Sequence, residues 1–222
     1  MIACAGEAVG HRRERVANMH IETPVPPRER AEIAPPVSRP QPIVVALIGL
    51  PGAGKSVVAR ALEDQLGLRR VDRDAIRHAM FPKCSYSFAE KRAAFRSMLL
   101  ALEINCMLGE SSVIDGVTFS RRRDLARVDS VIGRYKFTPV ALYLECPPEI
   151  ARARIASDVE HNRHLARDRT PEVVNDVLAR FEAPPSSALL IDASQPATEM
   201  CRIALEAVAA ILGAHGMPAS SA

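Results

Sequence analysis

Apolar and polar positions follow two alternating patterns along most of the chain. Short, continuous apolar runs of strand length are separated by longer segments in which apolar residues recur at helical spacing. The pattern predicts strands at 43–48, 69–71, 112–114, 140–144 and 188–191. Strands that alternate with helices favour a parallel sheet covered on both faces. We therefore expect an α/β fold of three layers (α/β/α), with a five-stranded, mainly parallel sheet.

The same pattern predicts helices between the strands. They are expected at 56–66, from 73 to 80, from 87 onward, from 120 to about 135, from 147 onward, at 171–181 and at 199–212. Ser120 is expected to cap the helix that follows it. Two helices carry an apolar stripe that predicts a core face. The stripes consist of Phe88, Phe95, Leu99, Leu102 and Cys106 in the first, and Met200, Ile203, Ala207 and Ile211 in the second.

The first 42 residues lack this periodicity. Seven prolines lie between Pro24 and Pro42, mixed with Arg and Glu. Such a composition is typical of segments that do not form a packed element. The sequence therefore predicts a disordered N-terminal extension over 1–42, one folded domain over 43–213 and a flexible C-terminal tail over 214–222.

Composition narrows the functional classes only slightly. A net charge of +3 does not by itself indicate a nucleic-acid partner. Most of the basic residues are arginines, whose planar guanidinium groups pair well with phosphate oxygens. The five cysteines have no C-x-x-C spacing, which is typical of reduced thiols in a cytosolic protein. No apolar run approaches the ~20 residues that span a bilayer, so we expect a cytoplasmic protein without a membrane partner.

One motif determines most of the functional prediction. Residues Gly49, Leu50, Pro51, Gly52, Ala53, Gly54, Lys55 and Ser56 match the phosphate-binding pattern G-x-x-x-x-G-K-[ST]. The motif lies between a predicted strand and a predicted helix, which is the required context and disfavours a simple glycine-rich turn. Backbone N–H groups of such a loop surround a polyphosphate, the lysine reaches the β- and γ-phosphates, and the hydroxyl binds Mg²⁺. The sequence therefore predicts that Mg²⁺ and ATP bind here.

Acidic residues follow the second and third predicted strands. Ligands of open parallel sheets bind beyond the carboxyl ends of the strands, so Asp74 is a candidate to orient an attacking hydroxyl and accept its proton. Arg77, three residues later on a helix, is expected to share its face and bind the same substrate. The alternative is that Asp72 or Asp74 only caps this helix. Asp115 is a candidate to support the metal, and Gly116 after it replaces the glutamate with which NTP-hydrolysing motors align water.

Arginines cluster after the fourth predicted strand. Arg152 and Arg154 lie early in a helix, and Arg163, Arg167 and Arg169 follow in a polar stretch. Such residues on a closing lid stabilise a transferring phosphoryl group and exclude water, although an ordinary solvated helix face is the alternative. Arg121, Arg122 and Arg123 lie at a predicted helix start, where cations are unfavourable. This placement suggests an anion nearby, such as a substrate phosphate.

Taken together, these motifs resemble the small P-loop kinase group of the P-loop NTPases over about residues 43–213. The stretch from Arg73 to Arg77 is similar to polynucleotide 5′-hydroxyl kinases, and Asp72 to His78 is similar to adenylylsulfate kinases. Asn162-Arg163 and the run Arg180-Phe181-Glu182-x-Pro184 resemble the lids of seryl-tRNA kinases. The resemblance implies that Asp74 is the general base and that Arg77 binds a phosphate of the acceptor.

The sequence thus predicts a kinase that transfers the γ-phosphoryl group of Mg·ATP to a hydroxyl of a small molecule. Lys55 and Asp74 are the predicted catalytic residues, and Ser56 and Asp115 the predicted metal ligands. Two alternatives stay open at this point. One is a kinase that acts on the end of a nucleic acid or on a tRNA-linked group, and the other is an ATP-dependent switch without a phosphate acceptor.

Overall fold

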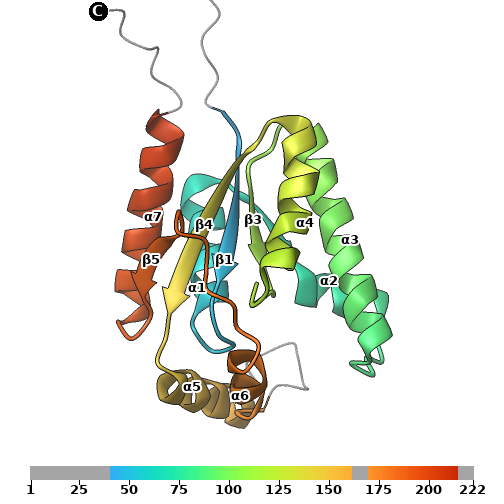
Figure 1. Ribbon diagram of the computed structural model, residues 1–222, viewed down its shortest axis with the longest axis vertical. Helices are drawn as coiled ribbons and strands as arrows, with labels where there is room; N and C mark the ends of the chain where they lie inside the picture. The colour runs from blue at the N-terminus through green and yellow to red at the C-terminus, as the bar shows by residue number, and fades with distance from the viewer. Residues whose placement is uncertain (1–40, 162–169, 215–222) are drawn as a thin grey trace, which may run out of the picture. The chain divides into compact units, whose positions relative to one another are not determined.

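Five parallel strands form one sheet in the order β2-β3-β1-β4-β5 (Figure 1). The computed structural model describes residues 41–161 and 170–214. The strands are β1 (Ile43–Ile48), β2 (Arg69–Asp72), β3 (Ser112–Asp115), β4 (Thr138–Glu145) and β5 (Leu189–Asp192). The helices are α1 (Lys55–Leu66), α2 (Arg73–Met80), α3 (Phe88–Met107), α4 (Arg122–Ile132), α5 (Pro148–Glu160), α6 (Val173–Leu178) and α7 (Ala197–Ala214), with a short 3₁₀ helix at Gly133–Tyr135. The predicted five-stranded α/β fold is confirmed, and every strand pairing is parallel.

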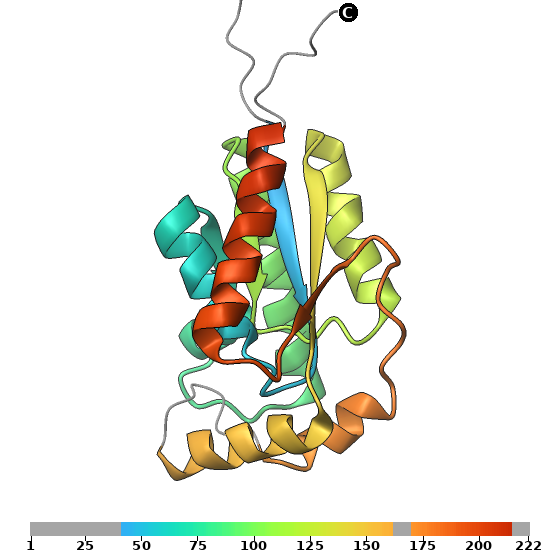
Figure 2. The same cartoon turned by 90° about the vertical axis from the view of Figure 1, so that its left-hand side faces the viewer.

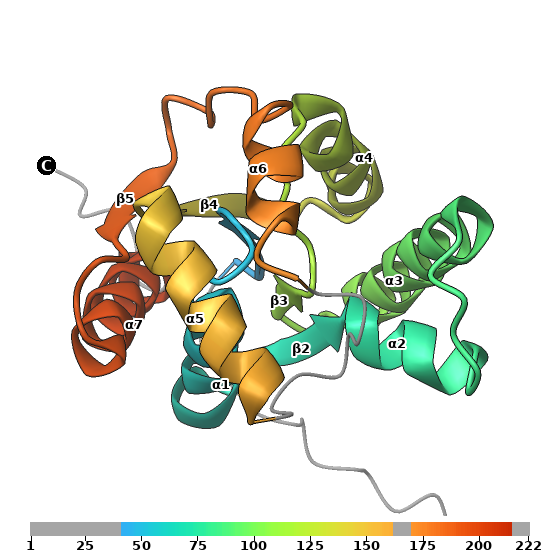
Figure 3. The same ribbon diagram turned by 90° about the horizontal axis from the view of Figure 1, so that it is seen from below.

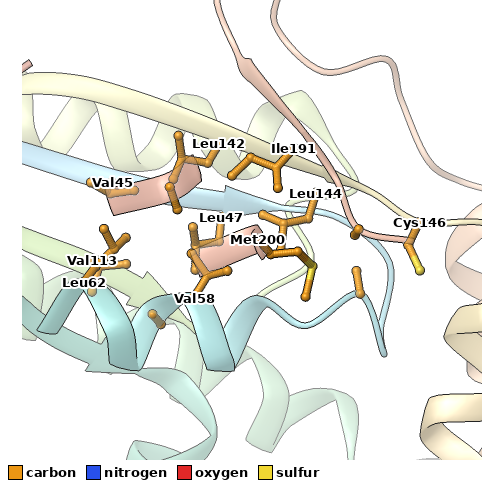
Figure 4. Packing of buried hydrophobic residues seen from close by; sticks show 14 of the residues in the cluster. Val45, Leu47, Val58, Leu62, Val113, Leu142, Leu144, Cys146, Ile191 and Met200 are labelled. Atoms are coloured by element: carbon orange, nitrogen blue, oxygen red, sulfur yellow. The ribbon is translucent and has the colours of Figure 1, made fainter. Parts of the chain in front are cut away.

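The central strand β1 is buried on both faces, which explains its continuous apolar sequence. Because successive side chains of a strand point to opposite faces, Ile43, Val45 and Leu47 join one core cluster. Val44, Ala46 and Ile48 join a second cluster on the other face. Figure 4 shows part of the first cluster, in which Val45 and Leu47 lie near residues of α1 and α7.

Helices cover each face of the sheet and also its lower end. Helices α1 and α7 pack on one face through residues that include Leu62 and Met200, while α3 and α4 pack on the other through residues that include Leu102 and Val128. Figure 2 shows α7 running alongside the strands, and Figure 3 shows α5 and α6 across the carboxyl ends of the strands. The predicted three-layer arrangement is therefore present, and the space beyond the strand ends lies between the sheet and α5–α6.

Local sequence sets the helix ends closest to this space. Asp72 caps α2, because its Oδ1 accepts hydrogen bonds from the backbone N–H groups of Asp74 (2.9 Å) and Ala75 (3.1 Å). Ser87 caps α3 by accepting from the N–H of Glu90 at 3.3 Å. The Glu90 carboxylate in turn accepts from the N–H groups of the preceding loop.

Three details of the helices differ from the prediction. Helix α4 begins at Arg122, and Ser120 does not cap it; Ser120 is buried before the helix and its carbonyl accepts from Glu182 N–H at 2.9 Å. Phe88 is 79% exposed, because the core face of α3 starts later. The buried positions of the two long helices are Ala94, Met98, Leu102 and Cys106 in α3, and Met200, Ala204 and Val208 in α7. Phe95 and Leu99 in α3 and Ile203 and Ile211 in α7, which the stripes also contain, are partly buried and pack against the core.

At the N-terminal side the described residues begin two positions before β1. Gln41 and Pro42, expected at the end of the extension, already contact the fold: Gln41 Nε2 donates to the carbonyl of Lys136 at 3.0 Å, and Thr138 N–H donates to that of Pro42 at 3.0 Å. The remainder of the predicted extension and all but the first residue of the predicted tail lie outside the described residues. No helix in the described part of the chain is long and apolar enough to cross a membrane.

Candidate active site

The phosphate-binding motif forms the turn between β1 and α1, as its sequence context predicts. Gly52 shows why small residues are needed here, because its φ of +81° lies in the left-handed region. A Cβ atom at this position would lie 2.4 Å from the carbonyl oxygen of Ala151 and 3.1 Å from Cγ1 of Ile155. The first turns of α5 therefore rest directly on the loop.

Lys55 begins α1 and is only 7% exposed. Its ammonium group donates hydrogen bonds to the carbonyl oxygens of Gly49 (2.9 Å) and Leu50 (2.7 Å). The charge is thus held within the loop, where phosphate oxygens of a nucleotide would replace these carbonyls as partners. The role predicted for Lys55 stays a prediction.

Ser56 and Asp115, the predicted metal ligands, are in direct contact. The Ser56 hydroxyl donates to Asp115 Oδ1 at 2.9 Å, and Gly116 N–H donates to the same oxygen at 2.7 Å. Asp115 ends β3 and is 2% exposed. Among the described residues no group of three His, Cys, Asp or Glu side chains could hold a metal ion by itself. One hydroxyl and one carboxylate fit Mg²⁺, which takes oxygen ligands and is usually held by one or two protein groups together with substrate phosphates.

The two aspartates at the junction of β2 and α2 have different contacts. Asp72 is the helix cap, whereas the Asp74 carboxylate lies in the first turn of α2 and pairs with Arg73 Nη2 (2.8 Å) and Arg77 Nη2 (3.4 Å). The capping alternative therefore applies to Asp72 and leaves Asp74 in a position to act on a ligand. Arg77 shares the face of Asp74, as its spacing predicts.

Arg77 is the most deeply buried arginine of the site, at 3% exposure. Its guanidinium lies over the ring of Tyr86, with 4.6 Å between Cζ and the ring centroid. The ring face and the Asp74 carboxylate compensate the buried charge. A fixed, desolvated guanidinium is suited to binding an anionic group of a ligand.

Gly116 explains how α2 approaches Asp115 so closely. Its φ is +75°, and a Cβ atom there would lie 3.0 Å from the backbone N of Asp74, 3.2 Å from Asp72 Oδ1 and 3.3 Å from the backbone N of Arg73. Glycine at this position therefore lets the first turn of α2 pack against the end of β3. A glutamate at this position would collide with the start of α2.

Sequence reasoning missed Arg70, which lies between these acidic groups. Its guanidinium contacts Glu63 Oε2 (2.7 Å), Asp72 Oδ2 (2.9 Å) and Asp115 Oδ2 (3.5 Å). Burial opposes the charge of Arg70, but the three carboxylates outweigh this effect and raise its pKa above the ordinary value. The signal was an arginine two residues before an aspartate on a strand, so that both side chains point to the same face.

A cavity of about 750 Å³ is lined by residues that the sequence predicts to bind the nucleotide and by residues that it predicts to bind the acceptor. Its lining includes Lys55, Ser56 and Asp115, and also Asp74, Arg77 and Lys91. The α5–α6 region contributes Arg154, Asp158 and Arg180. Arg154 Nη1 also donates to the carbonyl of Ala193 at 2.9 Å, which ties α5 to the loop after β5. The other predicted lid residues, Arg163, Arg167 and Arg169, lie outside the described residues, and Arg152 pairs with Asn175 instead (2.9 Å).

The anion expected near Arg121, Arg122 and Arg123 belongs to the chain itself. Glu182 Oε2 accepts a hydrogen bond from Arg122 N–H at 2.8 Å, and Arg122 Nε donates to the carbonyl of Ala183 at 3.2 Å. A carboxylate at the first turn of α4 is favourable, because it faces the positive end of the helix dipole. The interpretation of this cluster as a substrate phosphate site is therefore replaced by a structural one.

A phosphate-binding loop on a parallel sheet, with a carboxylate at the next strand end, defines a P-loop NTPase. Residues 44–184 match a family model described as an AAA domain. The chain belongs to this family, and within the P-loop NTPases it falls in the small P-loop kinase group.

Individual relatives support this placement. A shikimate kinase of Corynebacterium glutamicum is 32% identical over 145 residues, which cover 58% of this chain and 79% of that protein. The fold is also similar to an APS kinase of Mycobacterium tuberculosis in complex with AMPPNP and APS (TM-score 0.58, 19% identity, 78% of this chain and 99% of that one). A gluconokinase of Sinorhizobium meliloti has the same TM-score of 0.58 at 17% identity, covering 79% of this chain and 97% of that one. At these identities the two structures establish the fold alone.

Proposed function

We propose that this protein is a kinase that transfers the γ-phosphoryl group of Mg·ATP to a hydroxyl of a small, anionic molecule. The observation that carries the proposal is the shared cavity, whose lining includes Ser56 and Asp115 together with Asp74 and Arg77, and also residues of the phosphate-binding loop. Its volume of about 750 Å³ lies within the range of small-ligand sites. The curated relative, a shikimate kinase, also supports a small-molecule acceptor.

The proposed roles follow from the positions of the side chains. Lys55 and the loop amides hold the β- and γ-phosphates, and Ser56 with Asp115 would hold Mg²⁺, which neutralises phosphate charge when bound. Asp74 accepts the proton of the acceptor hydroxyl while the oxygen of that hydroxyl attacks the γ-phosphorus. The bond between that phosphorus and the bridging oxygen breaks, and ADP leaves with the electron pair. The products are ADP, the phosphorylated acceptor and one proton.

The anionic nature of the acceptor is inferred from the cations on its side of the cavity. Arg77 is buried and held in place by Tyr86, and Arg73, Lys91 and Arg180 line the same cavity. Asp74, in the first turn of α2, forms ion pairs with Arg73 and Arg77. A carboxylate, phosphate or sulfate on the acceptor would add the negative charge that several cations can bind.

This proposal is tested with γ-labelled ATP, Mg²⁺ and a panel of hydroxyl metabolites. The panel contains carboxylated, phosphorylated and sulfated compounds, neutral analogues of each, and an RNA oligonucleotide with a free 5′-hydroxyl. We expect label on an anionic small molecule and not on its neutral analogue. Label on the RNA would instead support a nucleic-acid kinase, and slow ATP loss without any labelled acceptor would contradict a kinase.

Two variants assign the roles once an acceptor is found. Lys55→Ala should lose nucleotide affinity and turnover because the phosphate charge is no longer met, with the circular dichroism spectrum unchanged. Asp74→Asn should bind nucleotide normally but lower kcat by roughly 10²- to 10⁴-fold, the usual effect of removing a general base. The matched controls are Lys83→Ala and Asp64→Asn, which change exposed residues that do not line the cavity. Normal turnover by Lys55→Ala would show that the loop has another role.

A further inference from the structure

Arg70 is one cation among three carboxylates, of which Asp115 lines the cavity and Asp72 caps α2. It projects from β2, and its side chain is three-quarters buried, with 25% exposure. The third partner, Glu63, comes from α1 and holds the Nε end of the guanidinium at 2.7 Å. The Nη1 end is thereby directed at Asp72 and Asp115 (2.9 and 3.5 Å).

The two oxygens of each aspartate face different partners. Asp115 turns Oδ1 to Ser56 and Gly116, and its Oδ2 lies toward Arg70. Asp72 uses Oδ1 to cap α2 and Oδ2 to accept from Arg70. A planar guanidinium is a rigid connector with fixed donor directions. One side chain therefore fixes both the carboxylate at the predicted Mg²⁺ site and the first turn of the helix that carries Asp74.

Arg70 also affects the charge balance around Asp115. Asp115 is buried at 2% exposure, so its carboxylate needs a compensating cation in the absence of Mg²⁺. Arg70 supplies that cation at Oδ2 of Asp115, whereas Ser56 contacts Oδ1. A divalent ion bound at the Ser56 side would share this carboxylate with Arg70, and the two cations repel each other.

We propose that Arg70 is a positioning residue that orients Asp115 and the first turn of α2 and at the same time weakens Mg²⁺ binding. The inference rests on the proposed function, because it assumes that Mg²⁺ with a nucleotide binds beside Ser56. It adds that a cation compensates the Asp115 carboxylate in both states: Arg70 in the free protein, and Arg70 together with Mg²⁺ when the nucleotide is bound.

The test compares Arg70→Met with the wild-type protein in two binding measurements. The first is the rise in Tm on adding Mg²⁺ with a non-hydrolysable ATP analogue. The second is the Kd of Mn²⁺, used as a paramagnetic probe with the same analogue. We expect a lower Tm for the free variant, a larger rise on loading, and a Kd for Mn²⁺ about three- to tenfold below the wild-type value, because one repelling charge has been removed.

A neighbouring arginine provides the matched control. Arg69→Met removes the same charge from the adjacent position of β2, where the side chain is 64% exposed and its nearest acidic partner is Glu110 at 3.7 Å. Its Tm rise and its Kd for Mn²⁺ should equal those of the wild-type protein. Arg70→Lys keeps the charge but not the fork, so we expect near-wild-type Mn²⁺ affinity with a lower kcat.

The outcomes separate the two proposals. No Tm rise in the wild-type protein would overturn the proposed function and the role of Arg70 together. A wild-type rise, with Arg70→Met showing no larger rise and no tighter Mn²⁺ binding, would overturn the role of Arg70 alone. An equal loss of Tm in the free and loaded states would likewise show that Arg70 is only structural. If Arg70→Met does not fold, Arg70→Gln, which keeps one donor without the charge, takes its place in the same measurements.

Discussion

Hydrogen bonds and ion pairs with neighbouring residues position the side chains around the cavity. Asp74 and Arg77 share one face of α2, and Asp72 fixes the start of that helix. Asp115 is oriented by Ser56 and by the N–H of Gly116. The geometry of the site therefore depends on residues that need not touch either substrate.

Gly116 gives a prediction at this scale. In Gly116→Ala the new methyl group would push the first turn of α2 away from the end of β3, because three of its atoms lie within 3.3 Å of the added carbon. We expect kcat to fall by roughly 10- to 100-fold, since a displacement of about 1 Å can cost that much, while nucleotide affinity is unchanged. Steady-state kinetics together with nucleotide titration measures both quantities.

The control for Gly116→Ala is Gly109→Ala. Gly109 has nearly the same φ (+74°), but nothing lies within 4 Å of the Cβ position. It therefore reports the cost of the backbone conformation alone, which should lower stability without changing kcat. Equal kinetic effects in both variants would mean that the contact with α2 is unimportant.

At the scale of elements, the sequence predicted the type of almost every element correctly. Continuous apolar strands such as β1 and the phosphate-binding motif have strong local signals. The exact faces of α3 and α7 were less predictable, because apolar residues occur around much of α3: Leu100 is 58% exposed, whereas Leu102 is fully buried. Which apolar residue is buried depends on neighbouring elements that periodicity does not contain.

These two leucines define a test of the core face of α3. Leu102→Ala should lower the free energy of unfolding by about 2–5 kcal/mol, the usual cost of deleting a buried leucine side chain. Leu100→Ala, two positions away on the same helix, should change it by less than ~0.5 kcal/mol, as exposed substitutions usually do. Urea unfolding of both variants measures the difference. Similar losses in the two variants would contradict the observed orientation of α3.

Across the whole molecule, residues far apart in sequence are brought together in ways that no local pattern indicates. Arg70 gathers carboxylates from α1, β2 and β3. Glu182 binds the start of α4, sixty residues earlier in the chain. The sequence suggested an anion near Arg122 but not its source, because only the tertiary fold places Glu182 there.

Glu182 gives the prediction at this largest scale. Glu182→Ala removes the acceptor for Arg122 N–H and a negative charge at the N-terminal end of α4, so we expect a loss of about 1 kcal/mol in the free energy of unfolding, as for other helix caps. Glu182→Gln keeps an acceptor and should lose less. Chemical denaturation at low and high salt separates the two contributions, since only the charge effect is screened. An unchanged free energy of unfolding in both variants would show that the contact between Glu182 and Arg122 does not stabilise the fold.

The contact between Gly52 and the first turns of α5 has a consequence for protein engineering. Ala151 and Ile155 fill the space that a side chain on the loop would need. The loop and α5 are thus complementary surfaces, even though about a hundred residues separate them in the chain. A chimera that receives this loop from another protein must receive a compatible α5 as well, or the two surfaces will collide.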